Sequence, residues 1–588
     1  MRKKIFYIIS AYAFVFGFGE YFHGDEFLGN QSIINIFLFA GAYFLLKGAF
    51  AIEDKRFRKY CGGFGVLLAA VLVVGHRLYV ENSIRSLLTV GGLAKGGISI
   101  FGFAMVLGAI LLLAMKQLEK VETLSSAQTW KLFGHPILLI VIMLAAWLPY
   151  YLAYYPGIFS YDVVMQTGQA LGALEMTRFH PPLHTFFWKL CLILEELVGI
   201  QALVIYSVVQ MAALAAAFCC VIRFLAKKGF HNGLILGGLL FFALNPVIAI
   251  FSFVPTKDAA LAIFLTLYIV ELCYFLTDRQ TYSKGIWKHV KLVVWAILCC
   301  LLRNNMVYAI VIAGIFMILF QKKLWKMVLL WCVSIVFGFG LVNGPVYTAL
   351  GVKEGSSAEM LSVPMQQLTC VVYYHEAELS EEDKAAIGQY LPVEELALRY
   401  NFRLADTVKG DFNSERFDES PLEFIKVWAR FLVRYPVEYA EAFLNLNLPY
   451  WYPDACSTDA ISKKAYIETH MMDTSEYGYQ VVRNSKLPWL LEKLEKVANY
   501  EAFRTKPIIA NLFSISTPIW VLLVSGLVLL IKRRKDMLLP LFPALGLWLT
   551  FMLGPVSNFR YMYPIIVLYP LYAALILQTN KIGKEKGE

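Results

Sequence analysis

Apolar stretches recur along most of the chain, separated by short polar segments. Many run for about 17 to 25 residues, the helix length that crosses the hydrocarbon core of a bilayer. The pattern predicts fourteen transmembrane helices, near 5–22, 32–51, 63–79, 97–115, 134–154, 200–222, 233–253, 258–277, 288–303, 305–320, 324–342, 509–531, 537–554 and 560–578. The first stretch lacks a small-residue cleavage site, so we interpret it as a retained helix. We expect an all-α polytopic membrane protein.

Lysine and arginine residues concentrate in alternate loops, for example at 53–59, 223–230 and 532–535. Basic loops stay on the cytoplasmic side, so the alternation predicts that both termini are cytoplasmic. The alternation holds only if the segment 183–199 is not a span. That segment carries Lys189, Glu195 and Glu196, and we expect an amphipathic helix on the outer surface.

Four regions follow from this topology: an N-terminal four-helix membrane extension (1–130), a membrane core (131–342) with a first outer loop at 155–199, an extracytoplasmic domain (343–508), and C-terminal helices with a cytoplasmic tail (509–588). The third region is polar and shows helical periodicity at 423–446. It is long enough to bury its own core, so we expect a mainly helical domain.

Composition agrees with this class of protein. Of 588 residues, 59% are hydrophobic and 16% are charged, whereas soluble domains carry roughly 25% charged residues. The net charge of +10 arises from basic loop residues that set topology, so we expect membrane lipids as partners and no nucleic acid. The ten cysteines show no metal-binding spacing. Cys370 and Cys456 share the third region and are either a disulfide or two free thiols.

Polar and ionisable residues gather in the short outer loops. They are Tyr161, Asp162, His180 and His184 in the first loop, Lys257 and Asp258 in the second, Arg303 and Asn304 in the third, and Asn558 and Arg560 in the last. Ionisable groups at membrane depth are costly to bury, which makes them candidates for function.

The residue types suit a phosphorylated substrate. Lys257, Arg303 and Arg560 can stabilise charge on a departing phosphate. Asp162 can take a proton from an attacking hydroxyl, and with Asp258 it could instead hold a divalent cation.

Each residue also has a purely structural interpretation. Asp162 and Asp258 are good helix N-cap residues. Lys257 can be a snorkelling anchor, and the two arginines can be interfacial anchors. His180 can simply shape the Pro-Pro turn that follows it.

The loop motifs resemble those of the GT-C superfamily, polytopic glycosyltransferases that use polyprenyl-phosphate sugars. PGIFSYDVVMQ, FHPPLH, VPTKDAA and LLRNN, with SVPMQQL at 362–368 and ADTVKGDFN at 405–413, are most similar to an uncharacterised bacterial group of GT-C-like proteins. The resemblance covers roughly residues 134–580. The four N-terminal spans lie outside the usual GT-C core.

The resemblance implies inverting sugar transfer from a polyprenyl-phosphate donor to a cell-envelope acceptor, on the outer face of a bacterial cytoplasmic membrane. Asp162 matches the first-loop acid of the family and Asp258 the second-loop acid, and His180 takes the polar position before PPL. We therefore expect Asp162, Asp258 and His180 as catalytic residues. We expect substrate contacts from Lys257, Arg303, Asn304, Arg560, Tyr161 and Trp451.

Trp451 belongs to the aromatic stretch LPYWYPD (448–454), which can stack on sugar rings or simply pack at the membrane interface. Better-known members carry a second acid beside the first one, whereas here Asp162 is alone between Tyr161 and Val163. A cofactor, Mg²⁺ or Mn²⁺ on Asp162 and Asp258, therefore stays open.

Two other functions fit the sequence. A transporter or flippase for a lipid-linked saccharide would place its ionisable residues near the membrane midplane and show repeated halves. This chain shows no repeat, and its charges lie at one face. A non-catalytic scaffold of cell-wall synthesis, with a decayed GT-C site, is the other alternative.

Overall fold

Helices account for nearly all the regular structure of the protein. The computed structural model describes residues 1–22, 33–120, 129–279, 282, 284–453, 471–498 and 514–577. Within these residues no β-strand forms, and isolated bridges join Thr177 to Lys353 and Leu404 to Val556. Cys370 is a buried free thiol, and Cys456 lies outside the described residues.

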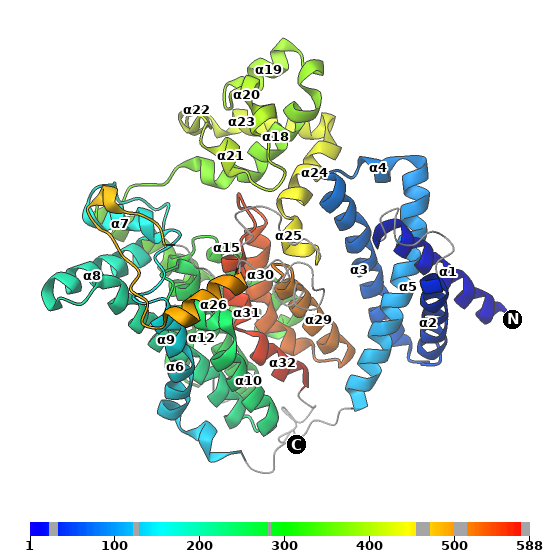
Figure 1. Cartoon of the computed structure of the whole chain (residues 1–588), viewed down its shortest axis with the longest axis horizontal. Helices are drawn as coiled ribbons and strands as arrows, with labels where there is room; N and C mark the ends of the chain where they lie inside the picture. The colour runs from blue at the N-terminus through cyan, green and yellow to red at the C-terminus, as the bar shows by residue number, and fades with distance from the viewer. Residues whose placement is uncertain are drawn as a thin grey trace.

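The N-terminal helices form a bundle beside the rest of the molecule (Figure 1). They are α1 (Arg2–Phe22), α2 (Ile33–Ala49), α3 (Lys55–Glu81), α4 (Arg85–Leu88) and α5 (Val90–Lys120). Asp54 caps α3 by accepting hydrogen bonds from the backbone of Arg56 and Phe57. Helices α3 and α5 approach closely because Gly65 has no side chain; a Cβ there would lie 2.6 Å from the carbonyl oxygen of Ala104.

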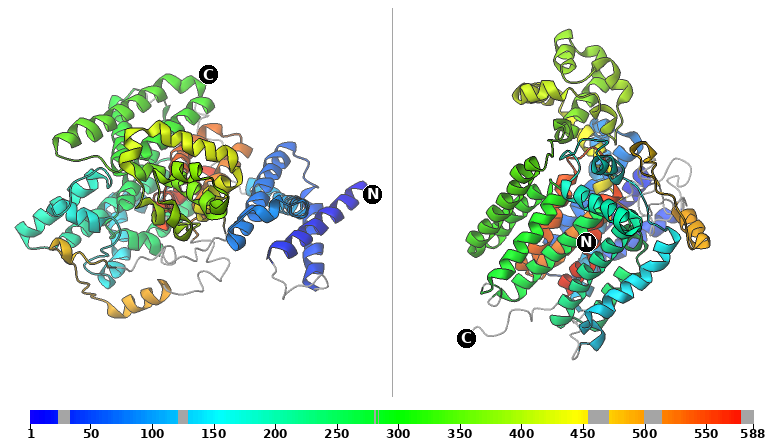
Figure 2. Two further views of the ribbon diagram at one scale, coloured as in Figure 1. Left: turned by 90° about the horizontal axis from the view of Figure 1, so that it is seen from above. Right: turned by 90° about the vertical axis from the view of Figure 1, so that its left-hand side faces the viewer.

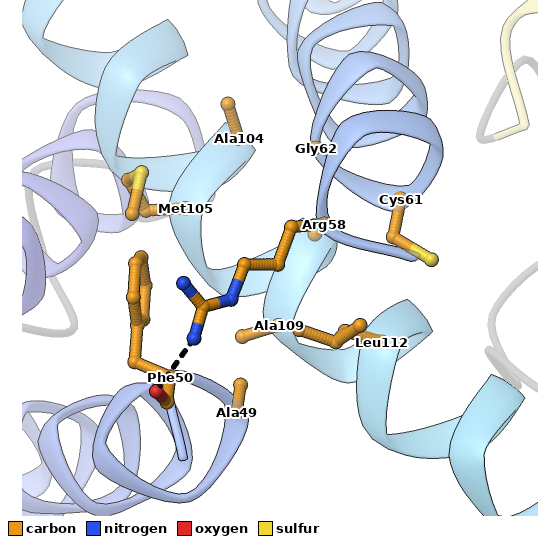
Figure 3. Close-up of a pocket in the computed structure, with 10 residues that line it drawn as sticks. Ala49, Phe50, Arg58, Cys61, Gly62, Ala104, Met105, Ala109 and Leu112 are labelled. Atoms are coloured by element: carbon orange, nitrogen blue, oxygen red, sulfur yellow. Dashed lines mark hydrogen bonds between the residues drawn. The ribbon is translucent and has the colours of Figure 1, made fainter. Parts of the chain in front are cut away.

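A pocket of about 230 Å³ lies between α2, α3 and α5 (Figure 3). Its walls are apolar apart from Arg58, which reaches across it toward Phe50. Arg58 Nη2 donates to the carbonyl of Phe50 at 3.0 Å, and Nε donates to Ile52 at 2.7 Å. These carbonyls lie just beyond the end of α2, so Arg58 ties the chain that leaves α2 to the first turn of α3.

The membrane core combines the middle of the chain with its C-terminal helices. Its first part contains η1 (Lys131–Gly134), α6 (Pro136–Ala153), α7 (Val163–Leu171), α8 (Pro182–Val198), α9 (Ala202–Lys227), α10 (Asn232–Leu244), α11 (Pro246–Phe251), α12 (Lys257–Thr277), α14 (Ile286–Leu302), α15 (Met306–Phe320), η2 (Lys322–Leu324), α16 (Trp325–Leu341), η3 (Val342–Val346) and α17 (Tyr347–Ala349). The C-terminal part contains α29 (Thr517–Ile531), η7 (Lys535–Leu541), α30 (Phe542–Phe551), α31 (Phe559–Ile566) and α32 (Tyr569–Leu577). The red C-terminal helices lie among the green ones in Figures 1 and 2, and both parts share one hydrophobic core.

Several helices are long and apolar enough to cross a membrane, so the chain is an all-α membrane protein. Among the described residues six meet both criteria: Lys55–Glu81, Val90–Leu118, Pro136–Ala153, Ala202–Lys227, Lys257–Thr277 and Lys322–Ala349. The pair α31 and α32, bent by 42°, makes a seventh if it is one span. Shorter apolar helices are Ile33–Ala49, Asn232–Leu244, Met306–Phe320 and Thr517–Ile531.

Fourteen spans are not supported by helix length and composition, since fewer helices meet both criteria among the described residues. Residues 509–513 of the predicted stretch 509–531 lie outside the described residues. Proline residues interrupt some of the other stretches. The stretch predicted at 233–253 divides at Asn245, which caps α11 ahead of Pro246. The stretch predicted at 560–578 bends after α31, which contains Pro564. The segment 183–199 is helical, as expected, and forms α8.

Residues 358–439, which follow α17, share a hydrophobic core of their own at the top of Figure 1. Further along the same region, residues 487–498 pack instead into the core of the membrane helices. We call the described part of the region, 350–453 and 471–498, the inserted domain. Its elements are η4 (Ser357–Leu361), α18 (Ser362–His375), η5 (Glu376–Glu378), α19 (Glu381–Gly388), α20 (Val393–Arg399), α21 (Asp406–Lys409), α22 (Ser414–Glu419), α23 (Pro421–Arg434), α24 (Pro436–Leu446), α25 (Leu448–Trp451), η6 (Ser475–Tyr477) and α26 (Pro488–Ala498). The expected helical character is confirmed for these residues.

Candidate functional site

Five charged side chains from separate loops and helix ends meet in one group, which we call the ion cluster: Lys257, Asp162, Arg560, Asp258 and Arg303. Asp162 Oδ2 lies 2.9 Å from Lys257 Nζ, and its Oδ1 accepts a 3.1 Å hydrogen bond from Arg560 Nη2. Asp258 Oδ2 lies 3.8 Å from Arg560 Nε, and its Oδ1 pairs with Arg303 Nη1. Arg560 therefore bridges the two carboxylates.

Asp162 and Asp258 lie at the beginnings of helices, but neither carboxylate caps its helix. Thr256 caps α12 by accepting from the backbone N–H of Ala259, so Lys257 and Asp258 begin the first turn. Asp162 stands at the N-cap position of α7 but makes no capping hydrogen bond. The structural interpretation of both acids as caps is wrong, because their carboxylates face the basic side chains instead.

The ion cluster is almost sealed from solvent. The side chain of Asp258 is fully buried, and those of Arg560 and Lys257 are 9% and 16% exposed. Burial acts to raise the pKa of Asp162, but Arg560 and Lys257 together hold that pKa well below its usual range. Three basic side chains face two carboxylates, so basic groups are in excess in the cluster.

Aromatic rings cover both guanidinium groups. Arg560 lies 4.4 Å from the ring centre of Tyr161, and Arg303 lies 4.4 Å from Phe551 and 4.3 Å from Tyr561. Such contacts stabilise a desolvated cation by about 2 kcal/mol. Tyr161 has a left-handed backbone with φ of 64°, a strained conformation for this residue, immediately before Asp162.

His180 lies beside the ion cluster and is 5% exposed. Neither ring nitrogen has a hydrogen-bond partner among the described residues. Burial lowers its pKa to about 4; Asp162 opposes this shift, and Lys257 and Arg560 reinforce it. His180 is therefore a neutral imidazole at pH 7, with two polar atoms available to a ligand. His184 lies deeper, in contact with Gln166 and Tyr206, and burial lowers its pKa to about 3.

Two residues expected to contact substrate lie outside the ion cluster. Asn304 donates a 3.5 Å hydrogen bond to the carbonyl of Arg178, in the loop that carries His180. Trp451 packs with Leu78 and Tyr452, next to the N-terminal bundle. The structure thus makes Asn304 a support of the His180 loop and places Trp451 in an apolar contact.

Residues that were not predicted from the sequence hold the loop before Arg560. Tyr450 stacks on Phe551 and donates to the carbonyl of Val556 at 3.3 Å. The backbone N–H of Ala405 donates to Pro555 at 2.8 Å, and Leu404 bridges to Val556. The available signals were LPYWYPD and the segment that begins at Ala405, both of which stood out in the sequence.

The donor set does not fit a divalent cation. Asp162 and Asp258 are each bound by two basic side chains. A metal ion would add positive charge where positive charge is already in excess. No group of three or more metal-ligating residues occurs in the part of the chain that the structure describes. We therefore derive no chemical step through Mg²⁺ or Mn²⁺.

Comparison with known proteins gives one match. Residues 196–587, more than half of the chain, match a family of unknown function (DUF6020). No curated protein and no solved structure matches the chain. The matched region contains Lys257, Asp258, Arg303 and Arg560, whereas Asp162 and His180 precede it. The chain belongs to this family of unknown function, DUF6020.

Proposed function

We propose that the protein is an inverting GT-C-type glycosyltransferase that moves a sugar from a polyprenyl-phosphate donor to a cell-envelope acceptor. The observation that carries the proposal is the ion cluster: a buried, positively charged group built from the loops that resemble GT-C motifs. A phosphate oxyanion matches its excess charge, and an acceptor hydroxyl matches its carboxylate.

Arg560 is the central phosphate ligand in this proposal. Its Nη1 is buried and has no hydrogen-bond partner among the described residues, while Nη2 donates to Asp162. Leaving a buried guanidinium N–H unsatisfied is unfavourable, and a phosphate oxygen would satisfy it. Lys257 and Arg303 add charge on either side, and Tyr161 holds the guanidinium plane in place.

Asp162 is the proposed general base. The acceptor hydroxyl gives its proton to Asp162 while its oxygen bonds to the anomeric carbon of the sugar. The bond between that carbon and the phosphate oxygen breaks, and the electron pair leaves with the polyprenyl phosphate. Binding of the phosphate draws Lys257 and Arg560 away from Asp162, which makes its carboxylate a stronger base. Neutral His180 can hydrogen-bond a sugar hydroxyl, and Asp258 holds Arg303 and Arg560.

The proposed setting is a bacterial cytoplasmic membrane. Both termini are cytoplasmic in this arrangement, and fourteen segments cross. The region 343–508 lies outside, where it meets the acceptor. The ends of helices, rather than their centres, supply the charged groups, which favours the enzyme over a saccharide transporter. A scaffold without activity is the remaining alternative, and the transfer assay separates it from both.

The test is sugar transfer by the purified protein in lipid nanodiscs, with a panel of radiolabelled polyprenyl-phosphate sugars and a cell-envelope extract as acceptor. We expect transfer by the wild type and a loss of about a hundredfold or more in Asp162→Asn. Binding of unlabelled polyprenyl phosphate should persist in that variant, because Arg560, Lys257 and Arg303 remain.

The matched control is Asp383→Asn in the inserted domain. Asp383 is also a buried carboxylate between two arginines, Arg430 and Arg434, but it lies outside the ion cluster. Transfer should be unchanged in this control. Equal transfer by wild type and Asp162→Asn would remove Asp162 from the chemistry. Movement of the lipid-linked saccharide across the membrane of proteoliposomes that contain the protein, without any transfer, would favour the transporter.

A further inference from the structure

A chain of buried polar side chains lies beneath the outer loops, and the proposed chemistry does not use it. It runs through Gln166 on α7, His184 on α8, and Tyr206 and Gln210 on α9, each 3% exposed or less. His184 Nδ1 lies 2.8 Å from Gln166 Oε1, and Nε2 lies 2.7 Å from Tyr206 Oη. Tyr206 Oη also lies 3.0 Å from Gln210 Oε1. We call these four residues the polar chain.

One end of the polar chain contacts the turn that precedes α12. Gln210 Nε2 lies within hydrogen-bonding distance of the carbonyls of Phe251, Ser252 and Val254, at 3.2, 3.0 and 2.8 Å. Ser207, one turn earlier on α9, donates to the carbonyl of Phe253 at 3.3 Å. Four consecutive carbonyls are therefore held by one face of α9. Thr256, Lys257 and Asp258 follow this turn, so its contacts with α9 fix where α12 begins.

The other end of the polar chain reaches the start of α7. The backbone N–H of Gln166 donates to the carbonyl of Asp162 at 3.0 Å, so the two residues share the first turn of that helix. The Gln166 side chain also donates to Thr185 on α8 at 3.0 Å. The polar chain thus connects the helix that follows Asp162 to the turn that precedes Lys257.

We propose that Tyr206 and Gln210 are positioning residues, which hold the beginnings of α7 and α12 at the separation that lets Asp162 pair with Lys257. Buried hydrogen bonds are directional, whereas apolar packing tolerates small shifts, so a polar connection fixes this separation more tightly than packing alone. A shift of about 1 Å in a catalytic group can lower a rate by about a hundredfold. That Tyr206 and Gln210 fix this separation follows from the contacts alone. That they affect catalysis rests on the proposed transferase function.

The test measures coupling between Asp162 and Lys257, which a general loss of stability does not alter. Asp162→Asn, Lys257→Met and the double variant are made in the wild-type and Tyr206→Phe backgrounds of the full chain, and Tm is measured in identical nanodiscs. In the wild type the two changes should be clearly non-additive, because the residues are in contact. In Tyr206→Phe the non-additivity in Tm should fall by more than half.

Tyr390→Phe is the matched control background. Tyr390 is a buried tyrosine of the inserted domain whose hydroxyl has no hydrogen-bond partner among the described residues. Coupling between Asp162 and Lys257 should stay at its wild-type value there. Equal coupling in the wild-type and Tyr206→Phe backgrounds would overturn the proposal. If Tyr206→Phe does not fold, Ser207→Ala, which removes only the bond to Phe253, should reduce the coupling to a smaller extent; unchanged coupling there overturns the proposal.

Transfer kinetics give the second readout. In a protein that transfers sugar, Tyr206→Phe should lower kcat about tenfold and change the KM for the donor less, because the phosphate ligands remain while Asp162 is displaced. Absence of transfer by the wild type would refute the proposed function and leave the coupling result standing. Unchanged kcat together with reduced coupling would confine the role of the polar chain to geometry and refute its catalytic part.

Discussion

Arg560 donates a 3.1 Å hydrogen bond to Asp162, which lies 398 positions earlier in the chain. The same guanidinium approaches Asp258, so one cation serves carboxylates from two other helices. All three groups are largely buried, and each depends on the others for its compensating charge. The ion cluster can therefore form only when the last helices of the chain have packed among the earlier ones.

Replacing Arg560 should be strongly destabilising. Arg560→Gln leaves Asp162 and Asp258 without their shared cation, and removal of one partner from a buried ion pair costs about 3–5 kcal/mol. We expect a clear fall in Tm and loss of polyprenyl phosphate binding. Arg430→Gln, which breaks a half-exposed pair with Asp383, is the control and should lower Tm only slightly. A Tm for Arg560→Gln equal to that of the control would contradict the bridging role.

Arg303 should not be replaceable by lysine. Arg303→Lys keeps the positive charge near Asp258 but loses the planar group that lies against Phe551 and Tyr561. We expect destabilisation by about 1–2 kcal/mol, measured as a fall in Tm. Arg178→Lys is the comparison, because Arg178 pairs with the exposed Glu354. If both substitutions have equal effects, the rings contribute nothing specific.

A methyl group at Gly75 should disturb the packing between α3 and α25. A Cβ at Gly75 would lie 2.3 Å from the ring of Tyr452, so one of the two must move. Overpacking of this kind costs about 1–3 kcal/mol, and Gly75→Ala should lower Tm. Gly62→Ala on the same helix meets nothing within 4 Å and should leave Tm unchanged or raise it, because alanine favours the helix. A lower Tm for Gly62→Ala than for Gly75→Ala would show that the contact with Tyr452 is loose.

Acid should destabilise the protein through His180. Burial lowers its folded-state pKa to about 4 from an ordinary value of 6.5, so the unfolded chain takes up a proton first as pH falls. Stability is constant above pH 7, decreases from about pH 6.5 toward 4, and has lost about 2 kcal/mol by pH 5 through this group. The fall in Tm between pH 7.5 and 5 should be smaller in His180→Asn. It should be unaffected in His135→Asn, which changes an exposed histidine. If the Tm of His180→Asn falls between pH 7.5 and 5 as much as the wild-type Tm does, His180 is protonated in the folded protein.

Much of the ion cluster could be predicted from the sequence, because its members follow from topology. Lys257, Asp258 and Arg303 lie in short turns between apolar stretches, so the predicted topology places them at one level of the bundle. The pattern could not show which cation meets which acid, because that depends on packing between helices distant in sequence. The pairing of Arg560 with both Asp162 and Asp258 is one contact that the pattern could not show.

Other features depend on side-chain direction, which hydrophobic pattern does not encode. Tyr450 and Trp451 are neighbours in one aromatic stretch, yet Tyr450 reaches the loop before Arg560 and Trp451 packs against α3. His184 looked like a second loop histidine, but α8 starts at Pro182 and turns it toward Tyr206. Hydrophobic pattern alone does not fix the number of crossing helices, because proline residues divide apolar stretches such as 233–253.

The contact of Leu404 and Ala405 with the turn at Pro555 and Val556 has a consequence for how the protein can be divided. The inserted domain contacts the turn that precedes Arg560. Deleting that domain would therefore free this turn and separate the guanidinium from both acids. A minimal membrane core lacking 343–508 would keep every charged residue of the ion cluster and lose their alignment. We therefore expect that the two parts cannot be exchanged separately between relatives.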